Sequence, residues 1–128
     1  MADGSYPEDL LYHPEHDWAK IDGDSATFGI TDFAQEALGE VVFFDPPTVG
    51  SSVTAGDSYA EVESVKAVSD VVAPLSGEIV EVNTALGDKP EAINSDPYGE
   101  GWMVKVRLSD PSETESLLDA AAYTAQLD

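Results

Sequence analysis

The stretch ESVKAVSDVVAPLSGEIVEVN, residues 63–83, places one lysine inside a valine-rich run and decides how we interpret the chain. Residues 58–64 and 67–72 are rich in β-forming side chains, so we expect two short strands that meet near Lys66. If these strands pair as a hairpin within residues 58–72, Lys66 lies at or beside its tip. An amine at a hairpin tip is far from the core and open to a partner from several directions.

Short segments of β-forming residues, separated by turns, make up most of the remaining chain. Residues 17–30 predict two strands joined by a turn at 22–24, and residues 40–44, 78–82 and 102–108 predict one strand each. Alternation in the last segment predicts that one side of the strand carries Trp102, Val104, Val106 and Leu108, and the other carries Met103, Lys105 and Arg107.

Two helices are also expected. Thr31 or Asp32 caps a short helix after residue 31, and Gly39 ends it. The run Asp110-Pro111-Ser112-Glu113 is typical of a helix start, so residues 111–126 are expected to form a C-terminal helix. Its apolar side would carry Leu117, Leu118, Ala121 and Ala125. Together the elements predict one mainly β domain over residues 1–128, a compact sandwich or barrel.

The charge of the chain limits its partners and its environment. The 26 acidic residues against 5 basic ones give a net charge of −21. Such a surface repels nucleic-acid backbones and anionic lipid, so we expect neither nucleic acid nor membrane as a partner. At roughly molar salt the Debye length falls to about 3 Å and screens this self-repulsion. We therefore expect a cytoplasmic protein from a high-salt prokaryotic cytosol; residues 1–10 contain no signal-peptide pattern.

Lys66 has two interpretations from the residues alone. A hairpin lysine is usually a solubilising surface charge. Here the chain contains few other lysines, the neighbours Val65 and Ala67 are apolar, and Glu63 and Asp70 flank the site at short distance. The alternative is that the amine is acylated and roots a swinging arm, since group-carrier cofactors bring their own chemistry and need only presentation. The chain contains no cysteine, so any sulfur redox chemistry would come from a cofactor.

Several motifs in order resemble one family. The stretch VESVKAVSDVVAPLSGEIVEVN closely resembles the lipoyl-lysine region of the glycine cleavage system H protein. Residues 29–40, GITDFAQEALGE, resemble the family signature G-I-T-D-x-A-Q-x-x-L-G-[DE]. INSDPYGEGWMVKV resembles its C-terminal loop and strand, and DPSETESLLDAAAY its final helix. The resemblance covers about residues 6–125, nearly the whole chain.

This resemblance implies a fold and a set of site residues. The fold would be a barrel-sandwich hybrid of two antiparallel sheets, with lipoate in amide linkage to Lys66. Glu63 would be a recognition residue for the lipoylating enzyme, a lipoate ligase or an octanoyltransferase. Asp17 and Asp70 would contact the loaded arm, although many family members have glutamate where Asp17 stands. A biotin carrier would usually show methionines beside its lysine, unlike Val65 and Ala67.

The resemblance also implies a non-catalytic carrier. It would shuttle an aminomethyl group from glycine decarboxylase (P-protein) to aminomethyltransferase (T-protein), and electrons to dihydrolipoamide dehydrogenase (L-protein). We expect a monomer. Two alternatives stay open: a relay that passes octanoyl or lipoyl groups to other acceptors, and an unmodified acidic interaction module.

Other site chemistry is weakly indicated. His13 and His16 lie near Glu15 and Asp17 and could form a metal site, but Pro14 disrupts helical presentation and the chain has no second histidine pair. We therefore expect no metal site, and no catalytic residue of the chain's own.

Overall fold

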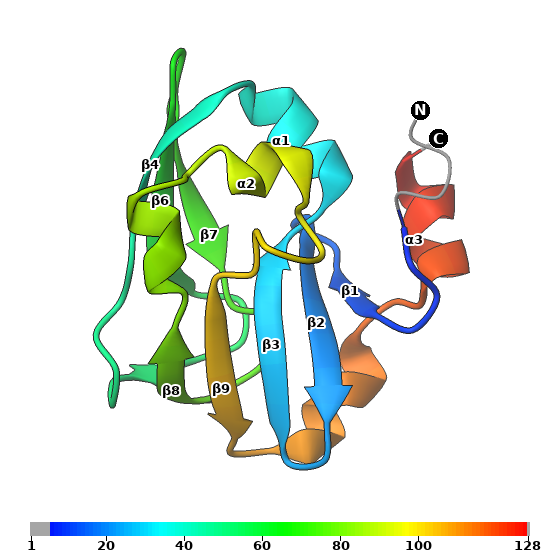
Figure 1. Cartoon of the computed structure of the whole chain (residues 1–128). Coiled ribbons are helices and arrows are strands. Elements are labelled where there is room, and N and C mark those ends of the chain that lie inside the picture. Colours follow the sequence, from blue (N-terminus) through cyan, green and yellow to red (C-terminus); the bar gives the residue numbers. More distant parts are fainter. Residues whose placement is uncertain (1–5, 128) are drawn as a thin grey trace.

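Two antiparallel sheets form the body of the protein, which a computed structural model describes over residues 6–127 (Figure 1). The first sheet has the strand order β1-β2-β3-β9-β8-β5, and the second has the order β4-β6-β7. The first sheet contains β1 (Leu11–His13), β2 (Asp17–Asp22), β3 (Ser25–Ile30), β9 (Val104–Leu108), β8 (Gly77–Val82) and β5 (Ser52–Val53). The second contains β4 (Val41–Asp45), β6 (Ser58–Ser64) and β7 (Val68–Val72). The expected mainly β architecture of two antiparallel sheets is confirmed.

The core lies between the two sheets and follows the period-two pattern of the strands. Val62 and Val71 from the second sheet, and Ile79 and Val106 from the first, are at most 1% exposed and belong to one apolar cluster. Burial of such side chains is the main favourable contribution to folding. Charged residues such as Glu61 point outward from the same strands, so each sheet keeps one face for solvent.

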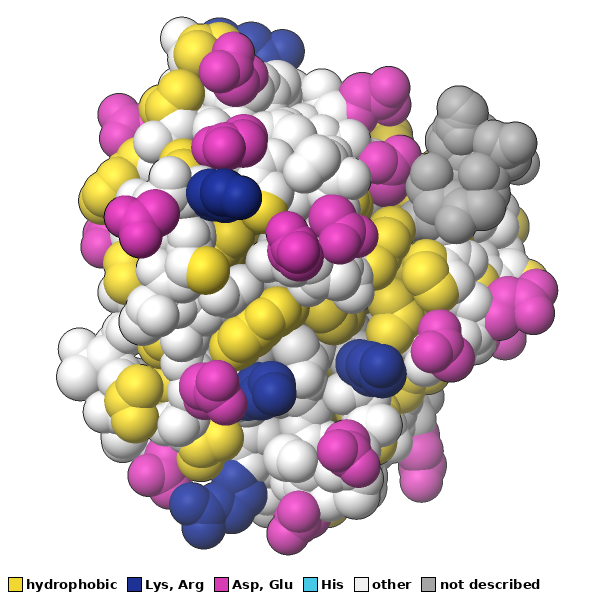
Figure 2. Space-filling model, in the orientation of Figure 1, with side chains coloured by type: hydrophobic (Ala, Val, Ile, Leu, Met, Phe, Trp, Pro, Cys, Tyr) yellow, Lys and Arg dark blue, Asp and Glu magenta, His cyan; other side chains and the backbone are white. Residues whose placement is uncertain are grey.

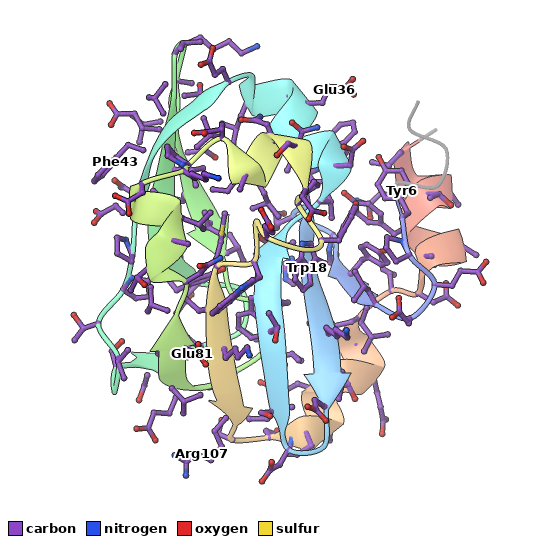
Figure 3. All side chains as sticks on the ribbon, viewed as in Figure 1. Tyr6, Trp18, Glu36, Phe43, Glu81 and Arg107 are labelled. Atoms are coloured by element: carbon purple, nitrogen blue, oxygen red, sulfur yellow. The ribbon has the colours of Figure 1, made fainter. Side chains whose placement is uncertain are left out.

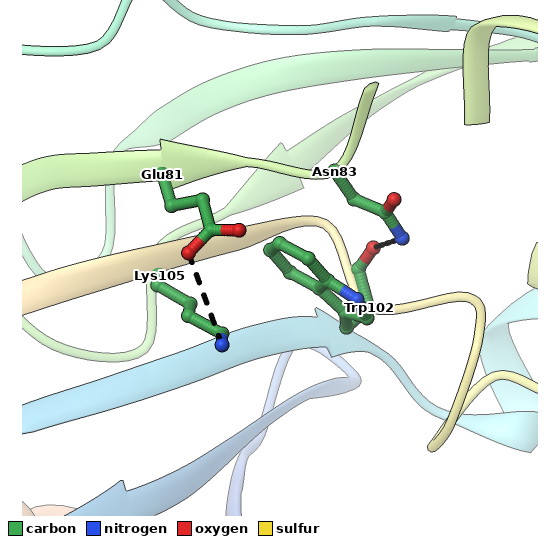
Figure 4. A network of polar contacts seen from close by, with 4 residues as sticks. All are labelled: Glu81, Asn83, Trp102 and Lys105. Atoms are coloured by element: carbon green, nitrogen blue, oxygen red, sulfur yellow. Dashed lines mark hydrogen bonds and ion pairs between the residues drawn. The ribbon is translucent and has the colours of Figure 1, made fainter. Parts of the chain in front are cut away.

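The alternation predicted for residues 102–108 holds only from Val104 onward. Lys105 is exposed, as expected, but Met103 is fully buried and Trp102 lies on the side of Lys105, whose Nζ is 5.2 Å from the centre of the indole ring (Figure 4). The expectation for these two residues is wrong because regular pleating begins at Val104. The preceding backbone belongs to the connection, where the Met103 N–H donates to the Phe28 carbonyl at 2.8 Å.

Two helices lie over one end of the sheets (Figure 1). The helix α1 (Asp32–Leu38) starts where the sequence indicates: the Thr31 side chain accepts a hydrogen bond from the Ala34 N–H at 3.3 Å. Gly39 ends this helix with a φ of 86°, a conformation that favours glycine. The second helix, α2 (Ala92–Ser95), is joined to α1 through Asn94, whose side-chain amide donates to the Gly39 carbonyl at 2.8 Å.

The expected C-terminal helix is divided into two parts. A 3₁₀ helix, η2 (Pro111–Ser116), is followed by an extended segment and then by α3 (Ala120–Leu127). The chain breaks because Leu118 exchanges two backbone hydrogen bonds with Tyr12 of β1, at 2.7 and 2.8 Å. The buried side of α3 therefore carries Ala120 and Tyr123, whereas the expected Ala121 and Ala125 are exposed.

Acidic side chains are spread over the face of the molecule shown in Figure 2, with a few basic side chains among them. Two exposed ion pairs are formed there by β8 and β9: Lys105–Glu81 at 3.9 Å and Arg107–Glu78 at 3.8 Å. Exposed pairs of this kind contribute little to stability. None of the helices within residues 6–127 is long and apolar enough to cross a membrane.

Candidate functional site

The turn between β6 and β7 presents Lys66 at the tip of a hairpin. Its geometry is set by Ser64, whose N–H donates to the Ala67 carbonyl at 2.8 Å. The Ser64 Oγ accepts hydrogen bonds from the N–H groups of Lys66 and Ala67, at 3.2 and 3.1 Å. Ser64 itself is buried, while Lys66 is exposed. One small hydroxyl therefore organises the turn backbone and leaves the lysine side chain accessible.

The tip rests on the C-terminal end of α1. The Val65 N–H donates to the Glu40 carbonyl at 3.0 Å, which fixes the turn to the segment that follows the helix. The aliphatic stem of Lys66 crosses Gly39 so closely that a Cβ on Gly39 would lie 3.2 Å from Lys66 Cε. Its ammonium group thus lies close to the C-terminal end of α1, where positive charge is favoured.

A cleft of about 230 Å³ lies beside this turn, between α1 and β7, and we call it the α1–β7 cleft. Its walls are mainly apolar and include Ile30, Phe33, Ala34, Ala37, Leu38, Val62 and Val71. Ala67, the residue after Lys66, lines it next to the turn. Polar groups come from two places: Glu15, His16 and Asp17 at the start of β2, and Ser69 and Asp70 on β7. An apolar channel with a few polar groups is a common form of ligand site.

Asp17 is the most unusual group in this cleft. The residue is 2% exposed, and its Oδ2 has no hydrogen-bond partner within residues 6–127. Burial raises the pKa of the Asp17 carboxyl well above its ordinary value; the Val72 backbone N–H opposes the rise and the Glu15 charge adds to it. A buried carboxyl oxygen without a partner is costly. A hydrogen-bond donor or a cation entering the cleft would satisfy it.

The other two predicted acidic residues lie in different positions. Asp70 is exposed and lines the α1–β7 cleft on the β7 side, so the structure brings Asp17 and Asp70 to the same cleft. Glu63 is exposed on β6, beside the hairpin tip and opposite Val68, and is outside the cleft lining. This position is open to an enzyme approaching Lys66.

His16 is a cleft residue that the sequence interpretation missed. Its ring packs against Phe33 with centroids 4.6 Å apart, and its Nδ1 lies 2.6 Å from the Tyr123 hydroxyl. Burial lowers the pKa of His16, and the Glu15 carboxylate partly opposes this. The His13 ring has a different partner, because its Nδ1 accepts a hydrogen bond from the Glu15 N–H at 3.0 Å. Within the described residues, no three or more histidine and acidic side chains are grouped to hold a metal ion.

Comparison with known proteins identifies the family. A family model described as glycine cleavage H-protein matches residues 10–128. The chain belongs to this family. It is similar to the glycine cleavage system H protein of Rubrobacter xylanophilus, with 56% identity over 122 residues that cover 95% of this chain and 94% of that protein. The H protein of Escherichia coli is 57% identical over 123 residues, or 95% of each chain.

A solved structure agrees with this membership. The crystal structure of a glycine cleavage system H protein from Mycobacterium marinum matches with a TM-score of 0.85 and 45% identity, covering 94% of this chain and 98% of that one. The resemblance stated from the motifs is therefore confirmed for the family and for the fold.

A second hollow, of about 520 Å³, lies away from the hairpin in this H-protein fold. It is lined by residues of the connection between β8 and β9, among them Asn83, Lys89 and Trp102. The Asn83 side-chain amide donates to the Glu100 carbonyl at 2.9 Å and to the Trp102 carbonyl at 2.8 Å, and so satisfies this part of the backbone. Figure 4 shows the bond to Trp102. Lys66 does not line this hollow, and we therefore assign the candidate site to the smaller α1–β7 cleft.

Proposed function

We propose that Lys66 carries lipoate in amide linkage and that the α1–β7 cleft receives the resulting arm. Supporting this, Lys66 is exposed at the tip of an ordered turn, and the cleft begins at the next residue, Ala67. Membership of the glycine cleavage H-protein family makes the chain a carrier component of the glycine cleavage system. The lysine's position beside an apolar cleft is the single observation that carries the residue assignment.

The residues of the cleft fit such an arm. The aliphatic part of a lipoyl chain suits the walls formed by Ile30, Leu38 and Val62. The unpartnered Oδ2 of Asp17 suits an amine at the far end of the arm, and Asp70 adds a second carboxylate on the β7 side. When bound, lipoate would supply a disulfide–dithiol pair that takes up and releases a one-carbon amine unit and two electrons. The chain contains no cysteine, so no protein thiol competes in exchange.

The proposal also gives roles to three acidic residues. Asp17 and Asp70 hold the amine of a loaded arm, and Glu63 is recognised by the lipoate ligase or octanoyltransferase that modifies Lys66. The partners are the P-protein, the T-protein and the L-protein, and the chain itself supplies no catalytic residue. It acts as a monomer in a salt-rich cytoplasm. Family membership supports the partners, and the net charge of −21 supports the salt.

The attachment site can be tested with a matched pair of lysine variants. Lys66→Arg removes the acceptor amine, and Lys20→Arg makes the same change at an exposed lysine on β2. After incubation with a lipoate ligase, intact mass and peptide mapping should show one lipoyl adduct on wild type and on Lys20→Arg. Lys66→Arg should carry none. An adduct on Lys66→Arg, or an unmodified wild type, would contradict the assignment.

A second experiment separates glycine cleavage from a pure relay role. Lipoylated wild type should support glycine–bicarbonate exchange by the P-protein, and the unlipoylated protein should not. A lipoylated protein that fails in exchange, yet donates its acyl group to other acceptors, would favour the relay. Protein from its native host with a bare Lys66 would favour an unmodified interaction module.

A further inference from the structure

A buried hydroxyl of the C-terminal helix joins two walls of the α1–β7 cleft. The Tyr123 hydroxyl lies 2.6 Å from His16 Nδ1 and 2.8 Å from Thr31 Oγ1. His16 lines the cleft directly before Asp17. Thr31 is the N-cap of α1, the helix that supplies Phe33 and Ala34 to the opposite part of the cleft wall. One phenol thus contacts both segments from behind the cleft.

Tyr123 is held firmly in this place. Its side chain is fully buried, and its ring stacks on Tyr12 of β1 with centroids 4.9 Å apart and an interplanar angle of 11°. Tyr6, labelled beside α3 in Figure 3, packs on the Tyr123 ring with centroids 5.6 Å apart. The hydroxyl is therefore presented by an aromatic cluster that is separate from the main core.

The backbone at His16 has an unusual conformation. His16 has a φ of 77°, a conformation that residues with a Cβ rarely adopt. Three hydrogen bonds hold the residue there. Its N–H donates to the His13 carbonyl at 2.9 Å, its carbonyl accepts from the Thr31 N–H at 3.1 Å, and its ring contacts Tyr123. The first two bonds fix the backbone, and Tyr123 gives the ring a hydrogen bond in addition to its packing against Phe33.

The protons of this chain of contacts can be assigned consistently. Burial raises the pKa of Tyr123 to about 12, so its hydroxyl keeps its proton. With His16 neutral, the Tyr123 hydroxyl donates to His16 Nδ1 and accepts from the Thr31 hydroxyl. Thr31 Oγ1 is then free to accept the Ala34 N–H and cap α1. Every polar group of the three side chains that faces this contact is satisfied.

We propose that Tyr123 is a positioning residue of the α1–β7 cleft, through which the C-terminal helix sets how tightly the cleft holds an amine-bearing arm. The hydroxyl fixes the His16 ring beside Asp17 and ties it to the N-terminus of α1. This inference rests on the proposed function of the cleft. Without the hydroxyl, the two walls keep their apolar contacts but lose the hydrogen bonds of Tyr123 with His16 and Thr31 that hold the walls in position relative to each other.

Two tyrosine variants separate positioning from stability. Tyr123→Phe removes the hydroxyl and keeps the stacked ring. Tyr12→Phe is the matched control, because the Tyr12 ring is equally buried in the same stack but its hydroxyl donates to the Pro7 carbonyl at 2.7 Å, outside the cleft lining. Thermal unfolding of both variants measures the loss of a buried hydroxyl in each. A difference between the two variants in the cleft measurements described below, beyond their difference in stability, is then due to the position of the hydroxyl at the cleft.

The first measurements use the unlipoylated protein. Amide exchange at Ala34, compared with the core amide of Ile79, should become about five- to tenfold faster in Tyr123→Phe, since a cap loses its support. Nitrogen NMR of the His16 ring should show that Nδ1 loses its hydrogen bond. Tyr12→Phe should leave both signals unchanged. His16→Asn, a residue type that tolerates positive φ, provides a second variant and should accelerate Ala34 exchange in the same direction.

A final measurement uses lipoylated protein charged with the one-carbon amine. Spontaneous formaldehyde release should be several-fold faster from Tyr123→Phe than from wild type or Tyr12→Phe. Equal release from a protected wild type and from Tyr123→Phe, or equal acceleration by both variants, would overturn the positioning role. Release from wild type as fast as from free lipoamide bearing the same group would instead refute the proposed function of the cleft.

Discussion

Replacing Asp17 by asparagine should stabilise the fold at neutral pH. Asp17 Oδ2 is buried without a hydrogen-bond partner in residues 6–127, and leaving such a group unsatisfied costs about 1–3 kcal/mol, or more when it is charged. Asparagine has nearly the same shape but cannot ionise, so it removes the cost of burying the charged carboxylate, and its amide oxygen can keep the contact with the Val72 N–H. We therefore expect the free energy of unfolding to rise by about 1–3 kcal/mol at pH 7.

The gain should depend on pH in a defined direction. In the unfolded chain the pKa of an aspartate is about 3.9. Burial raises the pKa of Asp17 in the folded protein, so the folded state holds its proton over a pH range in which the unfolded state has lost it. Wild type therefore loses stability as pH rises from about 4 to the pKa of the folded state. The asparagine variant has no such loss, so its advantage should vanish near pH 3.

Thermal unfolding in molar potassium chloride, which screens the general surface charge, is the assay. For a domain of this length, each kcal/mol moves Tm by about 3–5 °C. Asp70→Asn removes a charge from the exposed side of the same cleft, and should change stability by less than about 0.5 kcal/mol. An Asp17→Asn variant that is no more stable than wild type at pH 7, or equally stabilised at pH 3, would refute the reasoning. The same variant should lose affinity for an amine-bearing arm.

Three further changes test other parts of the structure. Raising potassium chloride from low to molar concentration should raise Tm, because it screens a net charge of −21; a falling Tm would contradict the high-salt interpretation. Gly39→Ala should cost about 1–3 kcal/mol and slow the lipoylation of Lys66, because Gly39 has a φ of 86° and a Cβ would lie 3.2 Å from Lys66 Cε. Gly23 has a φ of 64° with open space around it, so Gly23→Ala should lose stability without slower lipoylation of Lys66. Equal lipoylation rates in the two glycine variants would argue against the contact between Gly39 and Lys66. Val68 is 59% exposed beside the hairpin tip, and Val68→Ser should lower kcat/KM of the P-protein reaction with little change in Tm. Val49 is 57% exposed elsewhere, and Val49→Ser should change neither kcat/KM nor Tm. Equal kcat/KM values for the two variants would show that the P-protein does not dock on the hairpin face.

Local signals predicted the elements that depend on local chemistry. The cap at Thr31, the stop at Gly39 and the strands on either side of Lys66 follow from side chains a few residues apart. The division of the C-terminal helix could not be predicted in this way. It depends on the backbone pairing of Leu118 with Tyr12, across more than a hundred residues of sequence, and that pairing outweighs a good local helix signal.

The same distinction applies to the candidate site. Lys66 stands out by composition and Asp70 by its closeness to Lys66, but only the family motifs select Asp17 or give either carboxylate a role, since the chain contains 26 acidic residues. His16 has a partner at Tyr123, 107 residues away, and no spacing rule connects them. Its positive φ is equally invisible in the sequence, because it results from hydrogen bonds to His13 and Thr31.

The Ser64 turn has a consequence for the movement of the arm that we propose on Lys66. Because the Ser64 hydroxyl and the Glu40 carbonyl immobilise the backbone at the tip, the hairpin is a fixed pivot. The arm then moves only by rotation about the single bonds beyond the Lys66 Cα. The end of the arm explores the space within one arm length of this point, which keeps its effective concentration at the neighbouring cleft high. Each departure of the proposed arm toward a partner active site would start from the same origin, and every return would be an intramolecular event.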